Sequence, residues 1–146
     1  MVGAIIYLPE ECKDFGFKTK GSVGFDICAK EETVINPKEL KLVSTGVRLK
    51  ILKEDIFAAV FLRSSLPIKK SLILANSVGI IDKDYCGKED EIKLALYNFG
   101  DEKVRIEKGE RIAQIVFLKF EKPEIKVTRD LDCFEDLSRG GFGSTG

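Results

Sequence analysis

The chain has 146 residues, of which 44% are hydrophobic and 33% charged, proportions that are ordinary for a soluble globular protein. This length suits one domain with a substantial core and is too short for two comfortable ones. Lys plus Arg and Asp plus Glu number 24 each, so the formal net charge is zero, and we expect no nucleic-acid partner because a broad basic field is missing. A small phosphorylated ligand would need only a few well-placed cations.

Membrane association and secretion are not expected either. No stretch approaches the roughly 18 apolar residues of a membrane span, and the first residues lack the features of a signal peptide. The four cysteines, Cys12, Cys28, Cys86 and Cys133, contain no C-x-x-C pair, which argues against zinc. Since the chain can build a core without disulfides, we expect four reduced thiols in a cytoplasmic protein. The absence of histidine excludes Ser-His and Cys-His catalysis and leaves carboxylates, a metal ion and arginine.

Short apolar segments separated by turn signals at intervals of about 8 to 12 residues predict an all-β sandwich or barrel. The expected strands are residues 1–8, 22–29, 33–37, 42–49, 56–62, 72–75, 92–97, 111–118 and 125–127. Within the second strand, Asp26 stands among apolar neighbours and would either satisfy backbone donors or face a metal ion. From the residues alone, the structural role is favoured.

Residues 63–71 interrupt the strand pattern and predict a short helix, with a serine N-cap and Pro67 in the first turn. A helix N-terminus beside Arg63 would be a natural cradle for phosphate. The alternative is a capped helix on the surface with no ligand.

Residues 79–87 are framed by two glycines and hold two carboxylates and one aromatic ring. Asp82 follows Ile80 and Ile81, at least one of which should belong to the core. That arrangement would fix the carboxylate at the edge of a rigid sheet, a suitable position for a catalytic base. The alternative is an ordinary turn with solvated acids.

The last eight residues, 139–146, include four glycines and cannot form a stable element of their own. A frayed, functionless terminus is one interpretation. The other is a closing lid, because Arg139 could meet phosphates while Phe142 stacks on a flat ligand.

Five segments occur in the order and spacing of the trimeric dUTP pyrophosphatases (dUTPases), which the chain resembles: residues 24–27, 63–66, 79–87, 109–114 and 139–146. The resemblance implies a jelly-roll-like β-barrel or sandwich with one short helix. It implies a β domain at residues 1–138 and a mobile C-terminal arm at residues 139–146. It also implies a homotrimer whose active sites lie at subunit interfaces and combine motifs from all three chains.

The activity implied by this resemblance is hydrolysis of dUTP to dUMP and pyrophosphate with Mg²⁺, which limits uracil incorporation into DNA and supplies dUMP for dTMP synthesis. Asp82 would activate the attacking water, and Asp26 would act on the metal ion through water. The implied phosphate-binding residues are Arg63, Ser64, Ser65, Gln114, Arg139, Ser144 and Thr145. The implied uracil and deoxyribose contacts are Asn76, Gly79, Ile81, Asp82, Tyr85 and Phe142.

Selectivity would follow from main-chain groups near Gly79, in a hairpin running from Asn76 to Asp82, that pair with the uracil edge. Cytosine would leave a buried polar group unpaired, and such sites reject analogues by roughly 10⁴-fold. The methyl group of thymine would lack room, and Tyr85 against the deoxyribose would exclude a 2′-hydroxyl.

The chain departs from the family pattern at Leu62, Ser65, Cys86 and the 88–90 turn. None of these removes a chemical group that the mechanism needs, but Cys86 replaces a frequent arginine and so bears on subunit contacts. Two alternatives remain open at this stage. A related dCTP deaminase would need a glutamate where Ala95 stands, and a non-catalytic nucleotide-binding protein would not need Asp26, Asp82, Gln114 and Arg139, which are all present.

Overall fold

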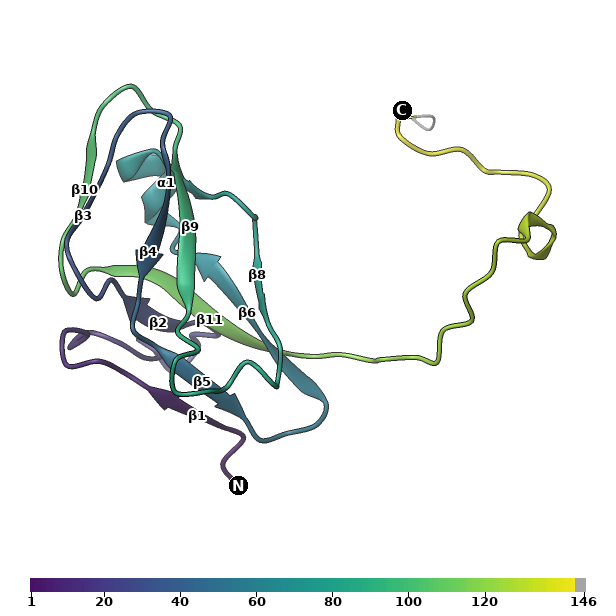
Figure 1. The fold of residues 1–146 in the computed structure, drawn as a ribbon, viewed down its shortest axis with the longest axis horizontal. Coiled ribbons are helices and arrows are strands. Elements are labelled where there is room, and N and C mark those ends of the chain that lie inside the picture. The colour runs from purple at the N-terminus through teal and green to yellow at the C-terminus, as the bar shows by residue number, and fades with distance from the viewer. Residues whose placement is uncertain (144–146) are drawn as a thin grey trace.

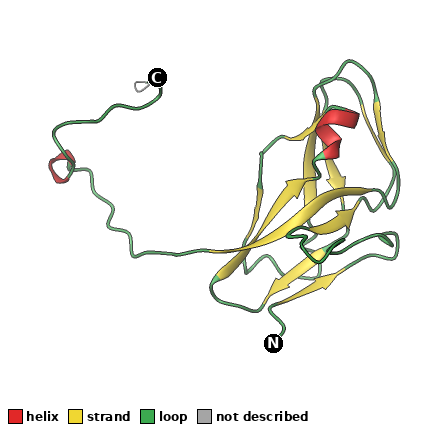
Figure 2. Cartoon of the chain, turned by 180° about the vertical axis from the view of Figure 1, so that it is seen from behind, coloured by secondary structure: helices red, strands yellow, loops and turns green. Residues whose placement is uncertain are grey.

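The computed structural model describes residues 1–143, and strands dominate it, with a single α-helix in this range (Figures 1 and 2). The strands are β1 (Ala4–Tyr7), β2 (Phe25–Cys28), β3 (Thr33–Ile35), β4 (Leu40–Ser44), β5 (Arg48–Ile51), β6 (Ile56–Leu62), β7 (Leu72–Leu74), β8 (Gly79–Ile81), β9 (Lys93–Asn98), β10 (Val104–Ile106) and β11 (Arg111–Lys119). The helix α1 spans Ser65–Lys70, and a 3₁₀ turn, η1, spans Leu131–Cys133. The predicted all-β class with one short helix is confirmed.

Two antiparallel sheets form the framework of the molecule. The larger has the strand order β2-β11-β6-β8 and the smaller the order β4-β9-β7, while β1 pairs with β5 and β3 with β10. The strands of the larger sheet do not close on themselves, so the architecture is a sandwich rather than a closed barrel. β8 is the last strand in its sheet, and within the described residues it pairs with β6 alone.

The core lies where the inner faces of the sheets meet. In β9, Leu94, Leu96 and Asn98 are buried and alternate with partly or fully exposed residues, the pattern of a strand with one face turned inward. In β6, three consecutive residues, Ala58, Ala59 and Val60, are buried, so the centre of this strand is covered on both faces.

Two fully buried polar side chains fasten the ends of strands. The Asn98 amide donates to the carbonyls of Ile35 and Glu102 at 3.1 and 2.8 Å, and its oxygen accepts from the Gly100 N–H at 2.9 Å. The Thr45 hydroxyl donates to a main-chain carbonyl at 2.5 Å. Because each buried group has its partners, burial stabilises these turns instead of weakening them.

The predicted strand at residues 42–49 is in fact two strands, β4 and β5. Gly46 separates them with φ of +68°, a conformation that glycine adopts without strain, and the chain turns there from the smaller sheet toward β1. Strand β10 was not predicted, because its alternation covers only three residues, Val104, Arg105 and Ile106.

Two further sequence predictions are wrong. Asn76 to Asp82 does not form a hairpin, because β7 pairs with β9 in one sheet and β8 pairs with β6 in the other. Residues 125–127 do not form a strand: Ile125 and Val127 are exposed, and residues 1–143 offer them no pairing partner. A short apolar run cannot hold strand conformation without such a partner.

After β11 the chain leaves the sandwich and runs away from it as far as the described residues extend, to residue 143 (Figure 1). Several large apolar residues of this segment are exposed, including Leu131, Phe134 and Leu137. No helix within residues 1–143 is long and apolar enough to cross a membrane.

The expectation of four reduced thiols is also wrong. Cys12 and Cys28 form a disulfide, with Cα atoms 5.3 Å apart, whereas Cys86 and Cys133 are free and exposed. The spacing of the cysteines gave no sign of this pair, because the segment before β2 folds back along that strand and brings together residues 16 positions apart. Both half-cystines are buried.

We expect the double variant Cys12→Ala/Cys28→Ala to unfold at a lower temperature than the wild type. A closed loop of this length stabilises a protein by about 3 kcal/mol, which corresponds to a melting temperature lower by roughly 6–12 °C for a chain of this size. Scanning calorimetry under non-oxidising handling measures the shift, and Cys133→Ala, at an exposed free cysteine, is the matched control. Titration of the denatured, unreduced wild type should find two thiols, and four would contradict the disulfide.

Candidate active site

The site begins with a bulge in β11 that brings two polar side chains to the same face. In the pairing of β11 with β2, Arg111 lies opposite Cys28 and Gln114 opposite Asp26, with a register shift between Arg111 and Ala113. In a regular strand, residues three apart point to opposite faces. The extra residue of the bulge reverses that relation, so Arg111 and Gln114 both share the face of Asp26.

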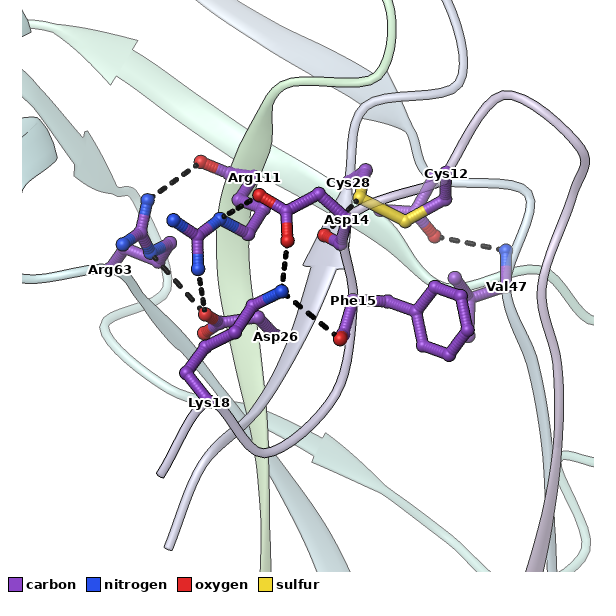
Figure 3. The surroundings of a disulfide bond; sticks show 10 residues. Cys12, Asp14, Phe15, Lys18, Asp26, Cys28, Val47, Arg63 and Arg111 are labelled. Carbon is purple, nitrogen blue, oxygen red and sulfur yellow. Dashed lines mark hydrogen bonds and ion pairs between the residues drawn. A yellow bond between two sulfur atoms is a disulfide. The ribbon is translucent and has the colours of Figure 1, made fainter. Parts of the chain in front are cut away.

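Asp26 is only 7% exposed, and two arginines compensate its charge. Its Oδ2 accepts a hydrogen bond from the Arg111 guanidinium at 3.0 Å and lies 3.8 Å from Nε of Arg63 (Figure 3). Arg63 directly follows β6, and its main-chain N–H donates to the carbonyl of Ile112 at 3.1 Å. Both arginine contacts use the same carboxylate oxygen, which leaves Oδ1 as the atom through which Asp26 can meet a water molecule.

Asp14 and Lys18 extend this cluster, and the sequence gave no reason to expect either of them there. Oδ2 of Asp14 lies 2.9 Å from Nε of Arg111, and the Lys18 ammonium donates to Oδ1 of Asp14 and to the Phe15 carbonyl (Figure 3). The hydrogen bond from Lys18, together with the charges of Arg111 and Lys18, lowers the pKa of Asp14 below its ordinary value. Arg111 therefore bridges two carboxylates that come from different segments.

Gln114 is fitted tightly against the chain before β2. A Cβ added to Gly24 would lie 2.0 Å from Oε1 of Gln114, so the amide can occupy its position only because residue 24 has no side chain. Nε2 of Gln114 is 3.4 Å from the Leu62 carbonyl at the end of β6. Asp26, Arg63 and Gln114, three of the predicted site residues, are thus brought together on one face of the larger sheet.

Ser64 and Ser65 stand beside this cluster at the start of α1. Ser64 is the N-cap residue and is exposed, but its hydroxyl makes no capping hydrogen bond to the helix. Pro67 lies in the first turn as predicted. Lys70, in the last turn, donates to the Arg105 carbonyl at 2.6 Å and to Glu110 at 2.8 Å, so this end of the helix is fixed to the turn that precedes β11.

A second group of predicted residues surrounds Asp82. Ile81, Asp82 and Tyr85 line a surface pocket of about 260 Å³ together with Ile80, Glu91, Ile92 and Lys93. The Tyr85 hydroxyl donates to the Glu91 carbonyl at 2.8 Å, and its N–H donates to the Asp82 carbonyl at 3.1 Å, which fixes the ring beside the carboxylate. Asp82 is exposed, whereas Ile81 packs against the core.

Gly79 and Asn76 lie just before this pocket and do not line it. Gly79 pairs with Val60 of β6, and a Cβ added to it would lie 3.3 Å from Cβ of Val60. Asn76 is exposed in the connection between β7 and β8.

The two groups are far apart within one chain. Asp26 lies opposite Gln114, which lies opposite Phe61, whereas Ile81 lies opposite Ala58 at the other end of β6. Three strand spacings and about four residues of strand therefore separate Asp26 from Asp82, on the order of 20 Å. Within the described part of one chain, the predicted base is therefore not brought to Asp26, Arg63 and Gln114.

The predicted arm residues lie outside both groups. Arg139 and Phe142 are exposed on the segment that leaves the sandwich, and Phe142 has a positive φ of 50°. Ser144 and Thr145 lie outside the described residues.

The residues at the cluster suit Mg²⁺ better than a metal held entirely by protein. Residues 1–143 contain no group of three histidine, cysteine or acidic side chains placed to hold a metal ion. Mg²⁺ keeps several waters and is usually bound by one or two carboxylates together with substrate phosphates. Asp26, with one oxygen engaged by arginines, fits that mode of binding.

Comparison with known proteins identifies the family. The dUTPase family model matches residues 10–146. The chain is 44% identical over 131 residues to the deoxyuridine 5′-triphosphate nucleotidohydrolase of Hydrogenobaculum sp., covering 89% of this chain and 88% of that protein. It is 41% identical over 131 residues to the enzyme of the same name from Lactococcus lactis, covering 88% and 84% respectively.

Among solved structures, dUTPase from Streptococcus mutans has a TM-score of 0.73 at 34% identity over 82% of this chain and 98% of that one. The dUTPase of Staphylococcus bacteriophage 80alpha, solved with dUPNHPP, has a TM-score of 0.81 at 24% identity, over 98% of both chains, and so shares the fold. The chain belongs to the dUTPase family.

Proposed function

We propose that this protein hydrolyses dUTP to dUMP and pyrophosphate in a Mg²⁺-dependent reaction. The convergence of Asp26, Arg63 and Gln114 on one sheet face carries this proposal, because it gives a member of the dUTPase family a carboxylate, a guanidinium and an amide that suit a triphosphate beside a metal ion. In a cell, this reaction would limit the incorporation of uracil into DNA and supply dUMP for the synthesis of dTMP.

Asp82 is the proposed base. It orients a water molecule toward the α-phosphorus and accepts its proton as the bond to the leaving pyrophosphate breaks. The exposure of Asp82 at the edge of a sheet, beside the ring of Tyr85 that is fixed by its hydrogen bond to Glu91, supports this role because the carboxylate has a rigid support and access to solvent.

Arg63, Ser64, Ser65 and Gln114 are the proposed phosphate contacts of the folded domain. Guanidinium, hydroxyl and amide donors suit phosphate oxygens, and the hydroxyl of Ser64 is not used in capping α1. Asp26 would hold Mg²⁺ through water, and the bound ion would offset the negative charge that grows on the leaving group. From the arm, Arg139 would reach the terminal phosphate together with Ser144 and Thr145, and Phe142 would cover the base.

Recognition of uracil is assigned to the main chain of β8, with Asn76, Gly79, Ile81 and Asp82 around the base. Since β8 is an edge strand, the donors and acceptors on the side that faces away from β6 can pair with a uracil edge as a neighbouring strand would. A base with the reverse donor and acceptor pattern would leave these groups unpaired. Tyr85 would lie against the deoxyribose and exclude a 2′-hydroxyl.

We propose that the working unit is a homotrimer with shared active sites. A base that activates water at the α-phosphorus and a carboxylate that holds a metal ion at the same phosphates must act within a few ångströms of each other. In one chain, a distance on the order of 20 Å separates Asp26 from Asp82. The two carboxylates can act at the same phosphates if one copy supplies Asp82 and another supplies the cluster around Asp26. Cyclic symmetry would repeat such a site at each interface.

The substrate range gives the first test. We expect rapid release of pyrophosphate from dUTP with Mg²⁺, little release without it, and rates lower by on the order of 10³-fold or more for dTTP, dCTP and UTP. Pyrophosphate and ammonia are measured in parallel. Ammonia release from dCTP would favour a deaminase instead, and binding of dUTP without any turnover would favour a non-catalytic protein.

The role of Asp82 predicts a separation of binding from chemistry. Asp82→Asn should bind dUTP with a Kd within a few-fold of the wild type and lose at least about 100-fold in kcat, because the amide cannot accept the proton. Isothermal titration and single-turnover kinetics measure the two effects. Asp84→Asn, on the same turn, is the matched control. Full turnover by Asp82→Asn would remove this residue from the base role.

The shared site predicts recovery of activity in mixed assemblies. Asp82→Asn and Arg63→Ala should each be inactive alone, whereas a mixture unfolded and refolded together at equal amounts should regain about a quarter of the wild-type activity. One in four interfaces would then combine an intact Asp82 with an intact Arg63. No recovery, from a mixture that sedimentation shows to be assembled, would place both residues in the site of a single chain.

A further inference from the structure

We propose that Asp14 is a positioning residue of the phosphate-binding cluster and that the Cys12–Cys28 disulfide holds it in place. The expected effect on kinetics rests on the proposed function. The positioning of Arg111 by Asp14 rests only on the geometry of residues 12–28 and Arg111. Asp14 would act through Arg111, without touching the nucleotide.

The first observation is the contact itself. Arg111 offers Nε to Asp14 at 2.9 Å and a terminal nitrogen to Asp26 at 3.0 Å (Figure 3). With two anions on different edges, a guanidinium has one preferred orientation, whereas a single ion pair leaves it free to rotate. Asp14 thereby fixes the group that compensates the buried charge of Asp26.

The second observation is that Asp14 lies between two cross-links to β2. On one side, Cys12 is bonded to Cys28. On the other, Gly16 and Asp26 exchange two main-chain hydrogen bonds at 3.0 and 3.1 Å. Residues 12–16 therefore run along β2 as an irregular extra strand, and Asp14 stands two residues from each attachment.

The third observation is that the two attachments differ in their support. The Gly16 side is reinforced by the ring of Phe17, which packs edge-on against Phe25 with centroids 5.4 Å apart. The Cys12 side is held to β2 by the disulfide. Removing the disulfide therefore leaves Asp14 attached from one end only and free to move away from Arg111.

The direct test is the nitrogen-15 spectrum of the arginine side chains, which reports on Arg111 whether or not the protein hydrolyses dUTP. We expect a sharp, slowly exchanging Nε–H signal, assigned by its absence in Arg111→Lys. This signal should broaden or exchange rapidly in Asp14→Asn and in Cys12→Ala/Cys28→Ala, and it should persist in the matched control Asp101→Asn. An unchanged signal in Asp14→Asn would overturn the proposal. If the double cysteine variant does not fold, Asp14→Asn alone decides.

The kinetic test asks whether the disulfide acts through Asp14. Loss of the disulfide should raise the KM for dUTP by about two- to fivefold, the range for a half-exposed ion pair, with kcat within about twofold. In the Asp14→Asn background the same cysteine changes should leave KM unaltered, because residues that act as one unit are not additive. Equal effects in both backgrounds would overturn the link. Absence of dUTP hydrolysis in the wild type would count against the proposed function and leave the spectroscopic test intact.

Discussion

Asp26 is a carboxylate that is almost fully buried, and the need to compensate its charge determines how the rest of this site is arranged. An isolated charge in such a position is costly unless opposite charges and hydrogen bonds compensate it. Asp26 meets that condition through Arg111 and Arg63, and each of these depends on a separate feature of the larger sheet. Arg111 shares the face of Asp26 because of the bulge in β11, and Arg63 stands where β6 ends. The pairing of β2, β11 and β6 therefore also sets the charge balance of the site, because it places both arginines beside Asp26.

The same sheet also keeps the second group of functional residues at a distance. β8 lies two strands from β11, and its pairing with β6 carries Asp82 toward the end of β6 that is remote from Arg63. A rigid sandwich cannot bend to close such a gap, since its core is packed and its buried polar groups are satisfied. The fold supplies the two groups of residues that we propose to form one site, and we assign their union to assembly.

Much of this could be predicted from the sequence, and the failures have physical causes. The alternation of residues such as Leu94 and Leu96 predicted β9, and the proline and serines around residue 65 predicted α1. Contacts that depend on how distant segments fold together could not be predicted. Cys12 and Cys28 have no telling spacing, and Asp14 lies in a loop whose course is set by that disulfide and by the Gly16 bridge. The segment at residues 125–127 has strand-forming residues but no neighbouring strand within residues 1–143 to pair with.

The bulge in β11 is a feature that strand periodicity alone does not show. Strand periodicity would separate Arg111 and Gln114 onto opposite faces, and only the displaced register reunites them. The site roles of Asp26, Asp82 and the arm came from family resemblance, whereas the part played by Arg111 became evident only from its contacts.

The charged groups of the cluster around Asp26 are carboxylates, guanidinium groups and an ammonium group, and the sequence contains no histidine. Histidine is the side chain whose ordinary pKa lies in the range of mild acid and neutrality, and the hydrogen bond from Lys18 moves the pKa of Asp14 downward, away from that range. The protein side of the cluster therefore offers no imidazole whose charge would change in mild acid. A phosphate monoester dianion, in contrast, takes up one proton near about pH 6, so mild acid would act on the terminal phosphate of a nucleotide bound there.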